Sequence, residues 1–150
     1  MRVQVRYSGS VSAAIDDDIA LRMKEMGYHI GMAFQIKDDL FDFNLENKTG
    51  KPAGNDIREQ KYTLPLIYTL KNCSHKEKKE LFSLLKNFEK NKKTIHEINA
   101  IISLHHGFEY TETVMMNYIQ KAKDILKAMP QNEANQSLQI LIDYIVERNK

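Results

Sequence analysis

Apolar residues recur at three- and four-residue steps along most of this 150-residue chain. The longest run begins at Asp16 and continues to about Phe43, with apolar positions at Ile19, Met23, Met26, Ile30, Ala33 and Phe34. Residues at that spacing share one face of an α-helix, whereas a half-buried strand would alternate with a period of two. The pattern therefore predicts a long amphipathic helix in an all-α domain.

Polar residues that favour helix starts divide the middle of the chain into shorter segments. Thr63 is a candidate N-cap with Pro65 in the first turn, and that helix should continue to about Leu70. Ser74 should cap the next helix, whose apolar side is formed by Leu81, Leu84, Leu85 and Phe88. Thr94 is expected to cap another helix, which should end near His105, His106 and Gly107.

Two further apolar stripes predict the last two helices. The first extends from Glu109 to Met129 and ends before Pro130, which cannot continue a helix. The second contains Leu138, Leu141, Ile142, Ile145 and Val146. Residues 1–9 differ from the rest of the chain, because they alternate apolar and polar residues in a strand-like manner.

One face of the long helix is acidic, although the rest of that helix is apolar. At about 100° per residue, four side chains fall within an arc of roughly 100°: Gln35, Asp38, Asp39 and Asp42. Three carboxylates that lie so close repel one another, so a cation must offset them or their pKa values must rise. Hard oxygen ligands suit Mg²⁺ or Ca²⁺. The alternative is a solvated acidic face that binds nothing.

The segment from Asn44 to Gln60 is rich in turn-forming residues and predicts a long connection after this helix. Lys51 lies within that connection, and Lys61 follows ten residues later. A carboxylate-held Mg²⁺ that is flanked by lysines is suited to bind diphosphate. Mg²⁺ is therefore the cation that we expect at the acidic face.

Three segments of the sequence resemble the trans-type polyprenyl synthetases, also called isoprenyl diphosphate synthases. They are FQIKDDLFD at 34–42, GKPAGND at 50–56 and KYTLP at 61–65. Their order and spacing are similar to the second aspartate-rich motif of that family and the loop after it. Weaker similarity continues through GFEYTE at 107–112 to the last helix. The resemblance implies the C-terminal part of an all-α helical bundle around a central cavity.

The resemblance also implies an activity, which is the head-to-tail joining of an allylic diphosphate to isopentenyl diphosphate with Mg²⁺. Family members carry an earlier aspartate-rich motif on a facing helix, followed by an arginine pair, and nothing in this sequence plays that part. We therefore expect a single partial domain over residues 1–150, with an atypical start at 1–9 and little or no turnover from this chain alone. The alternative is a non-catalytic partner subunit or a truncated interaction module.

Individual roles follow from the same resemblance. The implied metal ligands are Asp38, Asp39, Asp42 and Asp56. The implied catalytic residues, which stabilise the leaving diphosphate, are Asp38, Asp39, Lys51 and Lys61. The implied substrate-binding residues are Phe34, Gln35, Lys51 and Lys61. Asp38 is the expected direct ligand, whereas Asp39 and Asp42 would act directly or through metal-bound water.

Three other groups of residues have competing interpretations. The consecutive aspartates at 16–18 could bind metal, but acids at a helix start stabilise free amides and the helix dipole, which we prefer. The adjacent His105 and His106 suggest zinc, but neighbours on a helix cannot readily share a metal, so we assign them to a helix C-terminus. The eight lysines within residues 71–93 lack an aromatic platform, so we expect a solvated face rather than a nucleic-acid or membrane patch.

Charge and composition limit the remaining functions. The formal net charge of +2 is nearly balanced, so no nucleic-acid partner is expected. Cys73 is the one cysteine and cannot form an internal disulfide, which fits a reducing compartment. No run of 18 apolar residues occurs, so no transmembrane segment is expected. We expect a cytoplasmic protein that forms a homo-oligomer, such as a dimer, or pairs with a synthase subunit.

Overall fold

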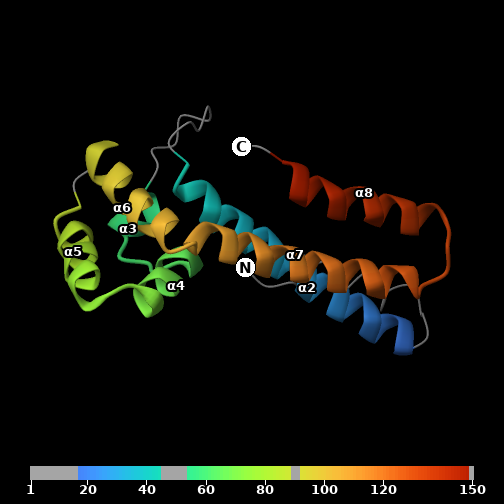
Figure 1. The fold of residues 1–150 in the computed structure, drawn as a ribbon. Coiled ribbons are helices and arrows are strands. Elements are labelled where there is room, and N and C mark those ends of the chain that lie inside the picture. Colours follow the sequence, from blue (N-terminus) through green and yellow to red (C-terminus); the bar gives the residue numbers. More distant parts are fainter. Residues whose placement is uncertain (1–16, 45–53, 89–91, 149–150) are drawn as a thin grey trace. The chain divides into compact units, whose positions relative to one another are not determined.

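The computed structural model describes residues 17–44, 54–88 and 92–148. These ranges contain seven helices and no strand, which confirms the all-α prediction (Figure 1). In chain order the helices are α2 (Asp17–Asp42), α3 (Asn55–Arg58), α4 (Leu64–Asn72), α5 (His75–Lys86), α6 (Lys92–Leu104), α7 (Gly107–Lys127) and α8 (Glu133–Glu147). None of these helices has both the length and the hydropathy needed to cross a lipid bilayer. The strand-like pattern of residues 1–9 lies outside the described residues.

The helix α2 begins and ends within one residue of the predicted bounds. Its buried side chains include Met26, Ile30 and Ala33, which are spaced three and four residues apart as the pattern requires. Acidic residues occupy its first turn, as the helix-start interpretation predicts, and one of them, Asp18, binds Arg22 Nε through Oδ2 at 2.7 Å. The sequence therefore specifies both the buried face and the start of this helix.

Two helix starts in the middle of the chain are those that the sequence predicts. Thr63 is the N-cap of α4, and Pro65 lies in the first turn. Ser74 is the N-cap of α5 and forms a capping box with Glu77. The Glu77 N–H donates to Ser74 Oγ at 3.3 Å, and the Ser74 N–H donates to Glu77 Oε2 at 2.9 Å. Because each side chain satisfies the other residue's free amide, the start of α5 is fixed locally.

The predictions for the next two helix starts and for the long connection were wrong in detail. The helix α6 begins at Lys92, so Thr94 lies inside its first turn rather than at its N-cap. The helix α7 begins at Gly107, two residues before the predicted start at Glu109. The short helix α3 forms within the segment that the sequence predicts as a connection.

The turn between α6 and α7 is tighter than its composition suggests. His106 adopts the left-handed region with a φ of 56°, which ends α6 and allows α7 to begin at the next residue. A Cβ at Gly107 would lie 2.5 Å from Thr69 Oγ1 and 2.8 Å from the carbonyl oxygen of Pro65. Only glycine fits where α7 begins against α4, so tertiary contact sets this boundary.

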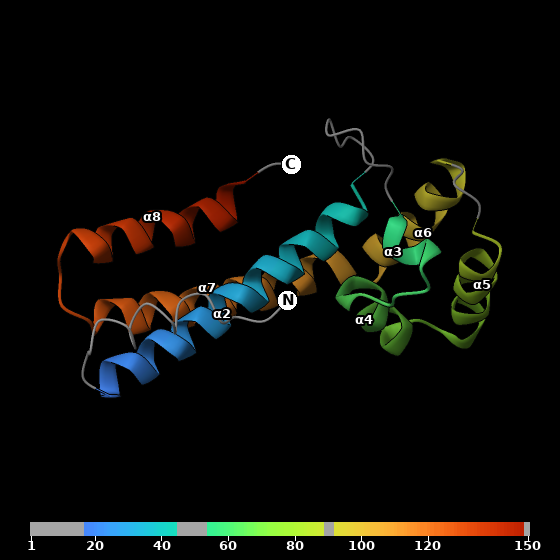
Figure 2. The ribbon, with the colours of Figure 1, turned by 180° about the vertical axis from the view of Figure 1, so that it is seen from behind.

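The chain divides into two compact units, and the second covers residues 36–113. Its core is a cluster of buried side chains from the residue after α2 and from α3 to α6: Phe43, Ile57, Leu66, Leu81, Ile98 and Ile102. The helix α6 contacts both α4 and α5, and Figure 2 shows this group of short helices. Burial of six large apolar side chains stabilises this unit without any strand in its described residues.

The first unit comprises, among the described residues, 17–35 and 114–148. Buried apolar side chains of α2, α7 and α8 form its core, including Met26, Ile119, Leu126 and Ile142. Polar bonds tie α8 to α7 within this unit. Asn135 Nδ2 donates to the carbonyl oxygen of Leu126 at 2.9 Å, and Lys123 Nζ binds Asp143 Oδ1 at 2.6 Å.

Candidate functional site

The acidic site lies in the second unit, where the last turn of α2 meets the short helix α3. Asp38, Asp39 and Asp42 belong to α2, and Asp56 belongs to the first turn of α3. All four residues are partly buried. The structure therefore brings Asp56 to Asp42, although 14 residues separate them in the sequence, and the charges of Asp38, Asp42 and Asp56 all act on Asp39.

The electrostatics of this site are unfavourable without a cation. Burial raises the pKa of Asp39 to about 6, and the charges of Asp56, Asp38 and Asp42 raise it further in that order of importance. A carboxylate with this environment is surrounded by like charge and partly removed from water. The chemistry of the donor set fits a hard divalent cation, which would relieve both effects.

Asp42 has a different environment from its neighbours, because both of its carboxylate oxygens accept backbone hydrogen bonds from α3. The N–H of Asn55 donates to Oδ1 at 2.9 Å, and the N–H of Asp56 donates to Oδ2 at 3.0 Å. The N–H of Gly54 also donates to the carbonyl oxygen of Asp42 at 2.8 Å. Burial raises the pKa of Asp42, and these two side-chain hydrogen bonds partly oppose that rise.

Gly54 allows the start of α3 to pack against Phe88 and against Ile95 of α6. It adopts a φ of 77°, in the left-handed region, and an added Cβ would lie 2.5 Å from Phe88 Cζ and 2.8 Å from Ile95 Cδ1. Sequence reasoning assigned Gly54 to a loop and missed α3. The signal was present, because a glycine followed by Asn55 and an acid is typical of a helix start in a tight turn.

Lys61 is near the acidic site, but it has carboxylate partners within the chain. Its Nζ lies 2.6 Å from Glu59 Oε2 and 3.8 Å from Asp56 Oδ1. Its backbone N–H donates to the carbonyl oxygen of Asp56 at 2.8 Å. The hydrogen bond to Glu59 and the negative charge of Glu59 raise the pKa of Lys61. Sequence reasoning did not identify Glu59 as a competitor for this lysine.

Three predicted site residues are not placed with this group. Lys51 lies outside the described residues. Phe34 and Gln35 fall in the first unit. Phe34 there contacts Arg148, whose guanidinium carbon lies 3.9 Å from the ring centroid and whose Nη2 donates to the Phe34 carbonyl oxygen at 3.4 Å. Gln35 is exposed.

The described residues contain no group of three or more His, Cys, Asp or Glu side chains arranged to hold a metal on their own. A Mg²⁺ site does not require such a group, because Mg²⁺ usually binds one or two carboxylates and completes its coordination with water and phosphate oxygens. The zinc interpretation of the two histidines has no further support in the described residues. His105 Nε2 lies 3.1 Å from Glu77 Oε1, and His106 Nδ1 lies 3.8 Å from Glu109 Oε1.

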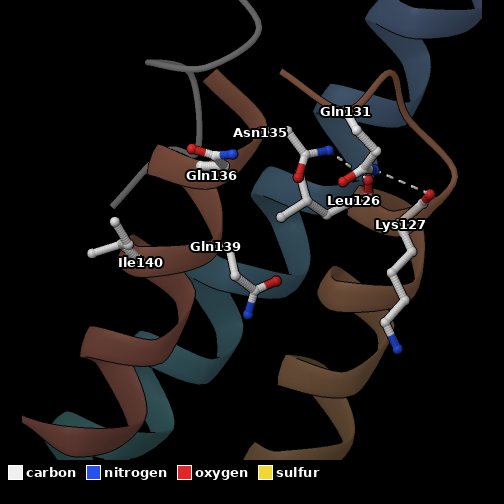
Figure 3. Close-up of a pocket in the computed structure, with 7 residues that line it drawn as sticks. All are labelled: Leu126, Lys127, Gln131, Asn135, Gln136, Gln139 and Ile140. Atoms are coloured by element: carbon white, nitrogen blue, oxygen red, sulfur yellow. Dashed lines mark hydrogen bonds between the residues drawn. The ribbon is translucent and has the colours of Figure 1, made fainter. Parts of the chain in front are cut away.

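A cavity of about 340 Å³ lies in the first unit between α7 and α8 (Figure 3). Its lining residues are Leu126, Lys127, Gln131, Asn135, Gln136, Gln139 and Ile140. Four of these seven carry side-chain amides and none is acidic, so the lining offers no carboxylate to a divalent cation. The acidic site on α2 and α3 is therefore the stronger candidate for metal chemistry.

Comparison with known proteins gives a consistent result. The model of the polyprenyl synthetase family matches residues 2–103. The geranylfarnesyl diphosphate synthase of Aeropyrum pernix is 35% identical, over 95% of this chain and 44% of its own length. Heptaprenyl diphosphate synthase component 2 of Bacillus subtilis is 33% identical, over 93% of this chain and 39% of its own length.

A solved structure shows the same fold. The polyprenyl synthase from Caulobacter crescentus, complexed with calcium and isoprenyl diphosphate, superposes with a TM-score of 0.82 at 29% identity. The match covers 96% of this chain and 44% of that one. This chain thus spans less than half the length of the proteins that it matches.

Proposed function

This chain belongs to the polyprenyl synthetase family, and on that premise we propose that its acidic site binds Mg²⁺ together with the diphosphate group of a prenyl substrate. The observation that carries the proposal is the environment of Asp39, whose pKa is raised to about 6 by burial and by three neighbouring carboxylates. A cation relieves that repulsion, and diphosphate in turn offsets the charge of the cation.

Each predicted residue has a role in this proposal. Asp38 would hold Mg²⁺ directly, and Asp39 would hold it directly or through water. Asp42 and Asp56 complete the acidic group. Diphosphate oxygens are bound by the side chains of Gln35, Lys51 and Lys61, with Phe34 beside the substrate. Lys61 must exchange its Glu59 partner for a phosphate oxygen, because its Nζ lies 2.6 Å from that carboxylate.

The proposed reaction is prenyl transfer, in which an allylic diphosphate joins isopentenyl diphosphate head to tail. Bound Mg²⁺ supplies positive charge that stabilises the leaving diphosphate. Lys51 and Lys61 donate hydrogen bonds to the same diphosphate, and the carboxylates hold the cation that offsets its charge. The carbon–oxygen bond of the allylic substrate breaks to release diphosphate and an allylic cation. The double bond of isopentenyl diphosphate attacks that cation, and the resulting cation loses a proton to the released diphosphate, which completes the longer product.

The chain spans 39% to 44% of the curated relatives described above, so the activity of a whole synthase is itself part of the proposal. We propose a cytoplasmic protein that forms a homo-oligomer or pairs with a synthase subunit. The name of the Bacillus subtilis relative, component 2 of a synthase, supports such a partner. A non-catalytic partner subunit is the alternative, and it would bind Mg²⁺ and diphosphate without supporting elongation in any assembly.

Titration calorimetry with inorganic diphosphate, with and without Mg²⁺, tests the binding proposal. Binding should be tighter with Mg²⁺, and Asp38→Ala should weaken it at least roughly tenfold. Asp124→Ala removes a similar carboxylate from an exposed position on α7 in the first unit and should leave binding unchanged. Equal binding with and without Mg²⁺, or equal effects of the two substitutions, would contradict the proposal.

A further inference from the structure

We infer that Asp42 is a positioning residue, which holds α3 against the end of α2 and so places the Asp56 carboxylate beside Asp39. The inference rests on the proposed function and deepens it. It assigns the third aspartate of the α2 cluster to the chain's own backbone rather than to the metal. The fourth carboxylate of the cation site then comes from α3.

The helix α3 needs such a contact because it cannot persist alone. It has four residues, Asn55–Arg58, which is far below the length at which an isolated helix is stable in water. Its N-cap is Gly54, which has no side chain to accept the first free amides. A cap must therefore come from elsewhere in the chain.

Asp42 supplies that cap from 13 residues away. Its Oδ1 accepts from the N–H of Asn55 at 2.9 Å, and its Oδ2 accepts from the N–H of Asp56 at 3.0 Å. Its carbonyl oxygen accepts the N–H of Gly54 at 2.8 Å. Three consecutive amides thus bind one residue, and the two bonds to its carboxylate are charge-assisted, which places them among the stronger hydrogen bonds in proteins.

The same contacts engage both oxygens of Asp42 before any ligand binds. Each oxygen accepts one amide of α3, so a metal at Asp42 would have to share each oxygen with an amide that already uses it. The positioning role of Asp42 follows from these two hydrogen bonds to the α3 backbone.

The position of Asp56 is the consequence that matters for the site. Its own amide is one of those that Asp42 binds, and its side chain is about three-quarters buried, at 26% exposure. From this place Asp56 adds negative charge beside Asp39, and its Oδ1 lies 3.8 Å from Lys61 Nζ. Release of α3 would move both a carboxylate and a lysine contact away from the acidic site.

Amide hydrogen exchange on the metal-free chain tests directly whether Asp42 holds the first amides of α3. Asp42→Ala should accelerate exchange at the amides of Asn55 and Asp56 by roughly tenfold or more, because both lose their acceptor. Asp124→Ala, which removes a carboxylate from an exposed position on α7, should not. Core amides such as those of Leu81 and Ile98 should stay protected in both variants, which separates local release from unfolding. Equal exchange at Asn55 and Asp56 in the two variants would overturn the inference.

A double-substitution cycle then tests whether Asp42 acts through Asp56. The readout is the affinity for inorganic diphosphate in the presence of Mg²⁺ for Asp42→Ala, Asp56→Asn and the pair. If Asp42 works by placing Asp56, the pair should bind no more than about twofold more weakly than the weaker single variant. Fully additive losses would show that Asp42 contributes independently, as a ligand would, and would overturn the positioning role. The exchange result needs no metal, so it stands or fails separately from the proposed function.

Discussion

Two carboxylates in the second unit have opposite environments. Burial and three neighbouring acids raise the pKa of Asp39 to about 6. Hydrogen bonds from Ser74, first from its side chain and then from its backbone, together with His105, lower the pKa of Glu77 to about 2. Glu77 is thus a carboxylate whose charge the chain satisfies, and Asp39 is one whose charge the chain leaves unsatisfied.

The difference separates a structural acid from a functional one. Glu77 completes the capping box of α5 and meets His105 Nε2 at 3.1 Å, so its negative charge stabilises the fold. The negative charge of Asp39 opposes the fold, since its neighbours are acids. A site that costs stability without a ligand is a candidate for ligand binding, because the ligand supplies what the chain does not.

The largest predicted effect breaks the approach of α3 to the acidic site. Gly54→Ala should destabilise the chain by about 2–4 kcal/mol, because alanine is strained at a φ of 77° and its Cβ would lie 2.5 Å from Phe88 Cζ. It should also weaken Mg²⁺-dependent diphosphate binding, because Asp56 is displaced. Chemical denaturation measures the loss of stability, and calorimetry measures the loss of binding. Ser83→Ala, at an exposed position on α5, is the control and should lie within about 0.5 kcal/mol of the parent. A Gly54→Ala protein of parental stability would contradict the packing described here.

The next prediction removes the unsatisfied charge itself. The pKa of Asp39 is higher in the folded chain than its ordinary value of 3.8, so the metal-free protein should lose stability as pH rises from about 4 to about 6. Asp39→Asn should abolish that loss and be more stable than the parent at pH 7.5. The rise in pKa corresponds to at most about 3 kcal/mol, and partial exposure to solvent reduces the expected gain to about 1 kcal/mol.

Thermal unfolding at pH 4 and pH 7.5 without metal measures this difference. The two proteins should be equally stable at pH 4 and should diverge only at pH 7.5. The same substitution should weaken Mg²⁺-dependent diphosphate binding, so stability and binding change in opposite directions. A substitution that lowers both would show that Asp39 is a structural residue like Glu77.

A smaller effect sharpens the comparison from the structural side. Ser74→Ala removes the hydroxyl that accepts the Glu77 amide and should cost about 0.5–1 kcal/mol of stability. It should leave Mg²⁺-dependent diphosphate binding unchanged, because Ser74 contributes nothing to the acidic site. The deficit of Ser74→Ala relative to the parent should narrow in acid, because the lowered pKa of Glu77 stabilises the parent above pH 4.5 and that contribution disappears towards pH 2. A binding defect in Ser74→Ala would remove the distinction between the two regions.

The smallest predicted effect concerns the ion pair that occupies Lys61. Glu59→Gln should free the Lys61 Nζ, which lies 2.6 Å from Glu59 Oε2. Diphosphate binding should then tighten by no more than about fivefold, because exposed ion pairs are weak. Calorimetry in the presence of Mg²⁺ measures this gain. Lys61→Gln should reverse it in the double variant. Unchanged affinity in Glu59→Gln would show that Lys61 does not exchange partners.

The parts of the fold that the sequence could predict are those with local causes. The length of α2, the start of α5 at Ser74 and the acidic face follow from spacings of three and four residues and from one capping box. The same reasoning misplaced the start of α6, because Thr94 is tolerated inside a helix as well as at its N-cap. Local patterns determine which residues face the core, but they leave several possible ends for each helix.

The parts that could not be predicted depend on residues distant in the sequence. The amides of Asn55 and Asp56 reach Asp42 across 13 and 14 residues. Asn99 Nδ2 donates to the carbonyl oxygen of Phe43 across 56 residues at 2.8 Å, which satisfies the backbone just after α2. No periodicity reports such contacts. The sequence could identify the acids, but only the fold shows that one of them caps α3.

Carboxyl ¹³C NMR titration of Asp39 and Glu77 in one sample tests the central claim most directly. The metal-free chain should show a pKa of about 6 for Asp39 and about 2 for Glu77. Saturating Mg²⁺ and inorganic diphosphate should lower the pKa of Asp39 below about 4, because a cation now favours its charged form, and should leave Glu77 unchanged. An Asp39 titration that Mg²⁺ and diphosphate do not move would contradict the claim that this site takes its missing charge from a bound ligand.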